Sequence, residues 1–167
     1  MINNKQLTIL KQKASLLGIP WKWLFNLINF ESAGFQPMVQ NPYSTAIGLL
    51  QWTDPRARDL GFNTSYQMIQ LNQSIEEQLE LIYRDLKRYA PFPTKQSLYM
   101  AVFLPSYRFK EGNSLFPQYI RKINFDIQSP NDYIKKVDSH FNAKSSTAYS
   151  YLILGGIIFY GWYKFRK

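Results

Sequence analysis

The chain has 167 residues, of which 46% are hydrophobic and 19% are charged. This size and balance are typical of one folded domain with at most a short appendage, and they exclude a compositionally disordered chain. There is no cysteine and a single histidine, His140, which excludes thiol nucleophiles, Cys/His zinc sites and multi-histidine metal sites. A Ser/His/Asp arrangement would have to include His140. Hydrolytic chemistry is therefore expected to rest on carboxylates, and no metal or organic cofactor is implied.

The chain is strongly basic, with 20 lysines and arginines against 11 aspartates and glutamates and a net charge of +9. Such an excess predicts binding to anionic polymers or surfaces, such as nucleic acid, acidic membranes or bacterial cell wall. The basic residues form neither one continuous run nor an arginine-rich arm, which disfavours nucleic acid. We therefore expect no nucleic-acid partner.

The beginning of the chain is predicted to fold as two helices joined by a short loop. Asn3 or Asn4 can cap the first helix, whose apolar residues recur at helical spacing up to Gly18. Pro20 suits the first turn of the second, which has the sequence WKWLFNLINFES. Because the second helix is apolar around most of its circumference, we expect it to be the buried one.

Four more helix signals follow, and alternation typical of strands is scarce. Pro55 starts a short third helix. Ser74 and Glu77 form a capping box at the start of a fourth. Thr94 can cap a fifth, and Ser129 precedes a sixth. The inward face of the sixth is predicted to consist of Ile134, Val137 and Phe141. The predicted fold class is mainly α.

The C-terminal segment differs from the rest. Residues 148–163, AYSYLILGGIIFYGWY, carry no charge and have aromatic residues at both ends, which favours one C-terminal transmembrane helix and a lipid membrane as partner. The alternative is a buried helix or strand. The predicted organisation is a helical domain at 1–141, a linker at 142–147, the membrane helix, and a basic tail at 164–167.

One acidic residue lies where chemistry would favour it. Glu31 is predicted at the end of the most hydrophobic helix, between Phe30 and Phe35, with Gly34 available to end the turn. Desolvation and the negative end of the helix dipole both disfavour its ionised form. A carboxylic acid that stays protonated near neutral pH can act as a general acid. The alternative interpretation is an exposed glutamate at a helix end.

A second feature is the loop NPYSTAIGLLQWT. Gly48 permits close approach of the backbone, and the amide of Gln51 can both donate and accept hydrogen bonds. Such an amide suits the N-acetyl and hydroxyl groups of an amino sugar. The alternative is a packed turn without contact to a ligand.

Together the two features resemble a known signature. The segment ESAGF at residues 31–35 and the segment AIGLLQ at 46–51, followed by Pro55, Ala57 and Gly61, resemble the ES…GLMQ signature of the soluble lytic transglycosylase family. The resemblance includes the helix before Glu31 and extends loosely to about residue 125. It implies a lysozyme-like helical domain.

The resemblance also implies an activity, which is cleavage of the β-1,4 bond between N-acetylmuramic acid and N-acetylglucosamine in peptidoglycan. In that family one glutamate makes both proton transfers and a 1,6-anhydro product forms, so this role would fall to Glu31. Ser32 would hydrogen-bond near the glutamate or the substrate, and Gln51 would position an acetamido group. Gly48 and Leu49 would shape the wall of the cleft.

One region departs from the family. An Ala-Tyr-Asn motif is often found on a later helix, where its tyrosine supports the glutamate. Here Phe103 takes the place of the tyrosine and Leu104 that of the asparagine. Tyr107 or Tyr99 can supply the hydroxyl instead, and Tyr107 is also a candidate for substrate binding. The alternative for each is a core or surface aromatic.

Two other functions remain open. A hydrolytic muramidase on the same fold would need a second carboxylate to activate water, and Asp54 and Asp59 are the candidates. Both also have ordinary explanations as helix-cap or surface residues. An inactive wall-binding or structural virion protein is the second alternative, against which the intact Glu31 argues.

The N-terminal sequence MINNKQLTILKQK has no apolar core of a secretory signal. Peptidoglycan lies outside the cytoplasmic membrane, and a virus particle could carry the domain there directly. We therefore expect a phage protein, anchored in the virion membrane through residues 148–163 beside other virion proteins. It would open the host cell wall as the genome enters. A host-made lysis or remodelling enzyme is the alternative.

Overall fold

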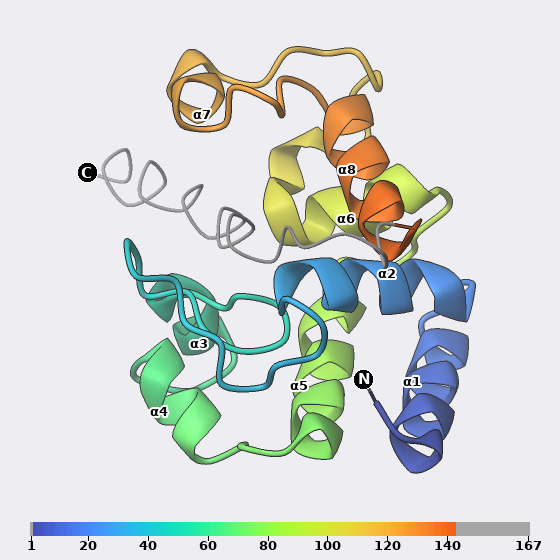
Figure 1. Cartoon of the computed structure of the whole chain (residues 1–167), viewed down its shortest axis with the longest axis vertical. Helices are drawn as coiled ribbons and strands as arrows, with labels where there is room; N and C mark the ends of the chain where they lie inside the picture. Colours follow the sequence, from blue (N-terminus) through green and yellow to red (C-terminus); the bar gives the residue numbers. More distant parts are fainter. Residues whose placement is uncertain (1, 143–167) are drawn as a thin grey trace.

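The computed structural model describes residues 2–142, and this part of the chain is mainly helical (Figure 1). Within it, β-type pairing is limited to two isolated bridges, Gln40 with Ile47 and Ile47 with Trp52. The helices are α1 (Asn4–Leu16), α2 (Trp21–Glu31), α3 (Asp54–Asp59), α4 (Ser65–Gln70), α5 (Ile75–Lys87), α6 (Lys95–Phe103), α7 (Gln118–Ile123) and α8 (Pro130–Asn142), with a 3-10 turn, η1 (Pro105–Tyr107).

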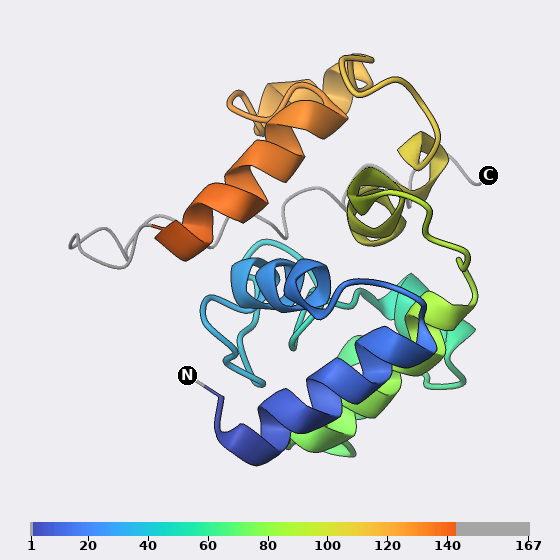
Figure 2. The same ribbon diagram turned by 90° about the vertical axis from the view of Figure 1, so that its right-hand side faces the viewer.

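The centre of the molecule is α2. It lies between a group formed by α1, α3, α4 and α5 and a group formed by α6, α7 and α8 (Figures 1 and 2). It packs on α1, α6 and α8, and Leu24, Leu27 and Ile28 on its inner face are fully buried. Its length and position carry the last residue, Glu31, into the middle of the fold.

The expectation that α2 would be the buried helix holds for one face only. Its aromatic residues Trp21, Trp23 and Phe25 are partly exposed. In α6, by contrast, every residue from Ser97 to Phe103 is buried. Several elements pack around α6, so its polar Ser97 is enclosed together with the apolar residues, which hydrophobicity alone did not indicate.

The predicted helix starts are confirmed where a polar residue can cap the first turn. Asn3 caps α1 and makes a reciprocal capping box with Gln6, Ser74 does so with Glu77 at α5, and Thr94 caps α6. A side-chain oxygen that accepts an N–H of the first turn is a local feature. It can therefore be recognised without knowledge of the tertiary structure.

Three short elements were not predicted, namely α4, η1 and α7. The helices α4 and α7 have six residues each, too few for a periodic apolar pattern to repeat. A cap was visible for α4, because the side chain of Thr64 accepts from the N–H of Gln67. In α7 no side chain caps the start at Pro117, and Ile120 is the buried residue.

The predicted membrane anchor requires a correction. No helix in residues 2–142 is both long and apolar enough to cross a membrane. Residues 148–163, on which that prediction rested, lie outside the described residues, as do the linker after residue 142 and the basic tail. The prediction of a single-pass protein held in a virion membrane is therefore not supported and is withdrawn.

Candidate active site

The candidate site is built around Glu31, the last residue of α2. Its side chain is partly buried, and Tyr133 on α8 donates a hydrogen bond from its hydroxyl to Oε1. Burial raises the pKa of Glu31 from 4.5 to about 7, opposed by the Tyr133 hydrogen bond and by the positive charge of Arg56. The carboxyl group can therefore be protonated or ionised near neutral pH.

A tight turn directly after Glu31 ends α2. The Ser32 hydroxyl donates to the carbonyl oxygen of Ile28 (2.6 Å) and accepts from the N–H of Phe35 (2.9 Å). Ala33, Gly34 and Phe35 all have left-handed backbone angles, with φ of 51°, 96° and 67°. Left-handed residues cannot continue a right-handed helix.

Ser32 therefore has an observed role in shaping this turn. Its side chain is fully buried, and both its hydrogen bonds go to the backbone around Glu31. The hydroxyl lies beside the glutamate in sequence, as expected. Its binding to substrate stays a prediction.

Tyr133 is enclosed by aromatic rings. The centroid of the Phe103 ring lies 4.3 Å from that of Tyr133, with the two rings tilted. The rings of Phe30 and Tyr99 meet Tyr133 edge-on, with centroid distances of 5.8 and 6.4 Å. Burial and the nearby negative charge of Glu31 both raise the pKa of the hydroxyl. Tyr133 consequently stays protonated and acts as a hydrogen-bond donor. Phe103 supports Tyr133 by packing and contributes no polar group itself.

Sequence reasoning missed Tyr133. The predicted inward face of the last helix contained Val137, which is fully buried, and Ile134, which is partly buried. Tyr133 precedes Val137 by one helical turn and so lies on the same face. The spacing could therefore have identified Tyr133. The prediction chose Ile134 because it selected apolar residues for the inward face.

The two tyrosines proposed for this role have other partners. The hydroxyl of Tyr107, in η1, donates to the carbonyl oxygen of Leu115 (2.9 Å). The hydroxyl of Tyr99 donates to Oδ1 of Asp138 (3.2 Å). Tyr107 thus fastens a loop, and any contact of its ring with substrate stays a prediction.

The loop around Gly48 is packed against α4 and α5. The N–H of Leu49 donates to Oε1 of Gln78 (2.9 Å), and Nε2 of Gln78 donates to the carbonyl oxygens of Pro37 (2.8 Å) and Asn72 (3.1 Å). Gly48 has φ of 84°, and a Cβ there would lie 2.7 Å from Cδ1 of Ile69. Tight packing therefore requires glycine at position 48.

Gln51 holds the same loop from inside. It is 4% exposed, has φ of 49°, and donates from Nε2 to the carbonyl oxygens of Val39 and Gly48, each at 3.1 Å. Both bonds are made by the amide nitrogen to backbone groups of the protein itself. The packed-turn interpretation accounts for this geometry, and the binding of an acetamido group by Gln51 stays a prediction.

The two candidates for a second carboxylate are engaged elsewhere. Oδ1 of Asp54 accepts from both the N–H and the hydroxyl of Ser65, each at 2.9 Å. The side chain of Asp59 is 61% exposed and lies 3.5 Å from Nη1 of Arg88. Asp54 thus supports the start of α4, and Asp59 is a surface residue.

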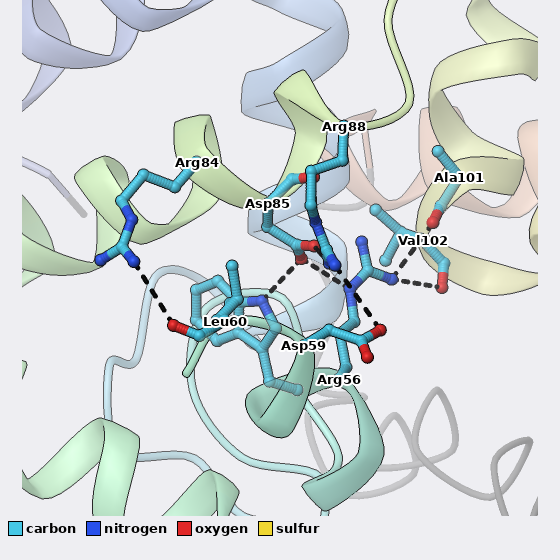
Figure 3. A network of polar contacts seen from close by, with 9 residues as sticks. Arg56, Asp59, Leu60, Arg84, Asp85, Arg88, Ala101 and Val102 are labelled. Carbon is cyan, nitrogen blue, oxygen red and sulfur yellow. Dashed lines mark hydrogen bonds and ion pairs between the residues drawn. The ribbon is translucent and has the colours of Figure 1, made fainter. Parts of the chain in front are cut away.

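A buried polar network lies between α3, α5 and α6 (Figure 3). Oδ2 of Asp85 accepts from Nε1 of Trp52 (2.8 Å) and from Nε of Arg56 (2.6 Å). Oδ1 of Asp85 accepts from Arg88. Nη1 of Arg56 donates to the carbonyl oxygens of Ala101 and Val102, both at 3.1 Å. Sequence reasoning did not find this network, because its members come from separate helices.

The single histidine lies near Glu31 on the aromatic side of the site. The His140 ring packs edge-on against Phe30 at 5.7 Å, and burial lowers its pKa. Across residues 2–142 no three His, Cys, Asp or Glu side chains gather as ligands for a metal ion.

Comparison of the chain with protein-family models, curated proteins and solved structures found no match. The resemblance to the soluble lytic transglycosylases, and with it the lysozyme-like fold, therefore stays a prediction from the residues quoted above.

Proposed function

We propose that this chain is a peptidoglycan lytic transglycosylase that cleaves the bond between N-acetylmuramic acid and N-acetylglucosamine. The observation that carries the proposal is the Glu31–Tyr133 pair. A partly buried carboxyl group with a pKa of about 7 can give a proton in one step and take one in the next. This is the property that a mechanism with a single glutamate requires.

In the first step, Glu31 in its acid form protonates the glycosidic oxygen. The bond from that oxygen to C1 of the muramic acid then breaks, and the glucosamine leaves with its new hydroxyl. Positive charge develops at C1, as in other glycosidic cleavages. The Glu31 carboxylate left behind is stabilised by the hydrogen bond from Tyr133.

In the second step, the Glu31 carboxylate accepts the proton of the C6 hydroxyl of the same muramic acid. The C6 oxygen forms a bond to C1 and closes the 1,6-anhydro ring. Glu31 is protonated again, and no water is consumed. The cycle needs no second carboxylate, which agrees with the separate roles of Asp54 and Asp59.

The contacts with substrate are proposed from the shape of the backbone. The backbone around the glutamate and the following loop is shaped by Ser32, Gly48, Leu49 and Gln51, so these residues would determine where a sugar can lie. We propose Tyr107 as an aromatic surface for a sugar ring. The predictions of a phage origin and of action as the genome enters are untested.

The test is mass spectrometry of the muropeptides that the 167-residue chain releases from purified peptidoglycan. We expect 1,6-anhydro-muramic ends with the native chain and none with Glu31→Gln. Glu111→Gln is the matched control, because Glu111 is exposed, and it should release the same products as the native chain.

The other outcomes reject the proposal in different ways. Reducing muramic ends that depend on Glu31 would identify a hydrolytic muramidase. If no product depends on Glu31 while the chain still sediments with peptidoglycan, the wall-binding or structural alternative would be correct.

A further inference from the structure

In the buried network between α3, α5 and α6, two guanidinium groups share one carboxylate. Arg56 and Arg88 both pair with Asp85, the single carboxylate of the buried part (Figure 3). The side chain of Asp85 is fully buried, and Arg56 is 7% exposed. Charges removed from water need an opposite partner. Arg88 is 34% exposed and has a second partner in Asp59, whereas within residues 2–142 Asp85 is the one carboxylate that pairs with Arg56.

Arg56 also has a hydrogen-bond donor without a partner. Its Nε bonds to Asp85, and its Nη1 bonds to the carbonyl oxygens of Ala101 and Val102. Its Nη2 is buried and makes no hydrogen bond. A buried guanidinium in this state retains attraction for a nearby negative charge.

A short series of contacts leads from Arg56 to the candidate site. The carbonyl groups that accept from Arg56 belong to the last turn of α6, directly before Phe103. The Phe103 ring packs on Tyr133 at 4.3 Å, and the Tyr133 hydroxyl bonds to Glu31. Arg56 is therefore connected to Tyr133 through the last turn of α6.

We propose that Arg56 is a positioning residue that stabilises the carboxylate form of Glu31 between the two proton transfers. This inference rests on the proposed function, because only a mechanism that uses Glu31 first as an acid and then as a base needs both forms. When Glu31 gives up its proton, its carboxylate becomes a negative charge near Arg56, whose buried Nη2 has no hydrogen-bond partner. The buried cation thus favours the state from which the second step begins.

Other charged and titratable groups lie on the elements packed around α2 and in the network itself. They include Lys11 on α1, Tyr99 and Lys95 on α6, Tyr133, Asp138 and His140 on α8, and, in the network, Asp85 and Arg88 on α5. Lys95 pairs with Asp138 at 2.6 Å, and Tyr99 donates to the same carboxylate. The charge of Arg56 and the hydrogen bond of Tyr133 are the two influences that favour ionised Glu31.

The test is direct titration of Glu31 by carbon-13 NMR in the full chain, with labelled glutamate. The signal of Glu31 is the one that disappears in Glu31→Gln. We expect the pKa of Glu31 to rise by about one unit in Arg56→Met, because a nearby opposite charge is lost. Arg56→Lys keeps the charge and should leave the titration close to that of the native chain.

A folded Arg56→Met chain in which Glu31 titrates at the native pH would overturn the inference. If Arg56→Met does not fold, Arg56→Gln replaces it, because its neutral amide can still donate hydrogen bonds within the network. The same rise is expected there, and its absence is equally decisive. The titration requires no substrate. A rise without any cleavage of peptidoglycan would therefore reject the proposed function and leave the electrostatic role of Arg56 standing.

Discussion

The hydroxyl of Tyr133 donates a hydrogen bond to Oε1 of Glu31 and so joins α8 to the last turn of α2 across 102 residues of sequence. Two opposing effects act on the carboxyl group. Burial favours its acid form, and the hydrogen bond favours its ionised form. Their balance gives a group that exchanges its proton near neutral pH, which isolated glutamate does not do.

Replacement of Tyr133 by phenylalanine removes this hydrogen bond and keeps the ring packing. A hydrogen bond to a charged group contributes about 1.5–3 kcal/mol, so we expect Tyr133→Phe to lower kcat by about tenfold or more. The pKa of Glu31 should rise above its native value, and the falling limb of the pH–rate profile should move to higher pH. Release of muropeptides at several pH values measures both effects.

The matched control for that variant is Tyr66→Phe, because Tyr66 lies on α4 and is largely exposed. It should behave as the native chain. Equal activity of Tyr133→Phe and Tyr66→Phe would show that the Tyr133 hydroxyl has no catalytic importance.

The pKa of Glu31 also makes stability depend on pH. Its pKa is 4.5 in a free side chain and about 7 in the folded chain. The acid form is therefore stabilising below about pH 4.5, and this contribution is lost as the pH rises through 7. A shift of this size corresponds to about 3 kcal/mol, since one pKa unit is about 1.4 kcal/mol.

Glu31→Gln cannot ionise, so it should escape this loss. We expect its free energy of unfolding to exceed that of the native chain by up to about 3 kcal/mol at about pH 8, with little difference at about pH 4. Urea unfolding at both pH values provides the measurement. A constant difference between the two chains at both pH values would contradict the raised pKa.

The aspartates after Gln51 should be dispensable for the chemistry. In Asp54→Asn the new Oδ1 can still accept from Ser65, and Asp59 is mainly exposed. We expect both asparagine variants to cleave peptidoglycan within about twofold of the native rate, since Asp54→Asn keeps its acceptor and a surface substitution such as Asp59→Asn has a small effect. A loss of activity in either variant as large as that of Glu31→Gln would indicate a water-activating carboxylate.

Gly48 should resist substitution for two separable reasons. In Gly48→Ala, the left-handed backbone costs about 1 kcal/mol, and the new Cβ meets Ile69 at 2.7 Å and Gln78 at 2.9 Å. In Gly61→Ala the same backbone penalty applies, but nothing lies within 4 Å. We therefore expect Gly48→Ala to lose about 2 kcal/mol more stability than Gly61→Ala, since overpacking of a tight site costs about 1–3 kcal/mol. Thermal unfolding of both chains makes the comparison, and equal losses would show that the neighbours of Gly48 can move.

Local features of the fold could be predicted from the sequence, and relations between distant elements could not. Helix starts at Asn3, Ser74 and Thr94 depend on side chains and N–H groups within one turn. The raised pKa of Glu31 also followed from local arguments, because the most apolar helix brings its last residue into a desolvated place.

The partners of Glu31 could be identified only from the tertiary structure. Tyr133 and Arg56 approach from α8 and α3, and neither is near Glu31 in sequence. The family pattern led instead to Tyr107 and Tyr99, whose hydroxyl groups bond to Leu115 and Asp138. A motif identifies a position on one helix, whereas the chain that packs against it decides which side chain supplies the hydroxyl.

The boundaries of α2 leave little freedom for changes in chain length. Gly18, with φ of 68°, lies before the helix, and the left-handed residues 33–35 lie directly after Glu31. Each residue of an α-helix advances the side-chain direction by about 100°. Insertion or deletion of a single residue between Trp21 and Glu31 would therefore turn the carboxyl group away from Tyr133, even if every remaining residue were conserved. Insertions and deletions that preserve activity should accordingly be found in the loops that flank α2 and never within its eleven residues.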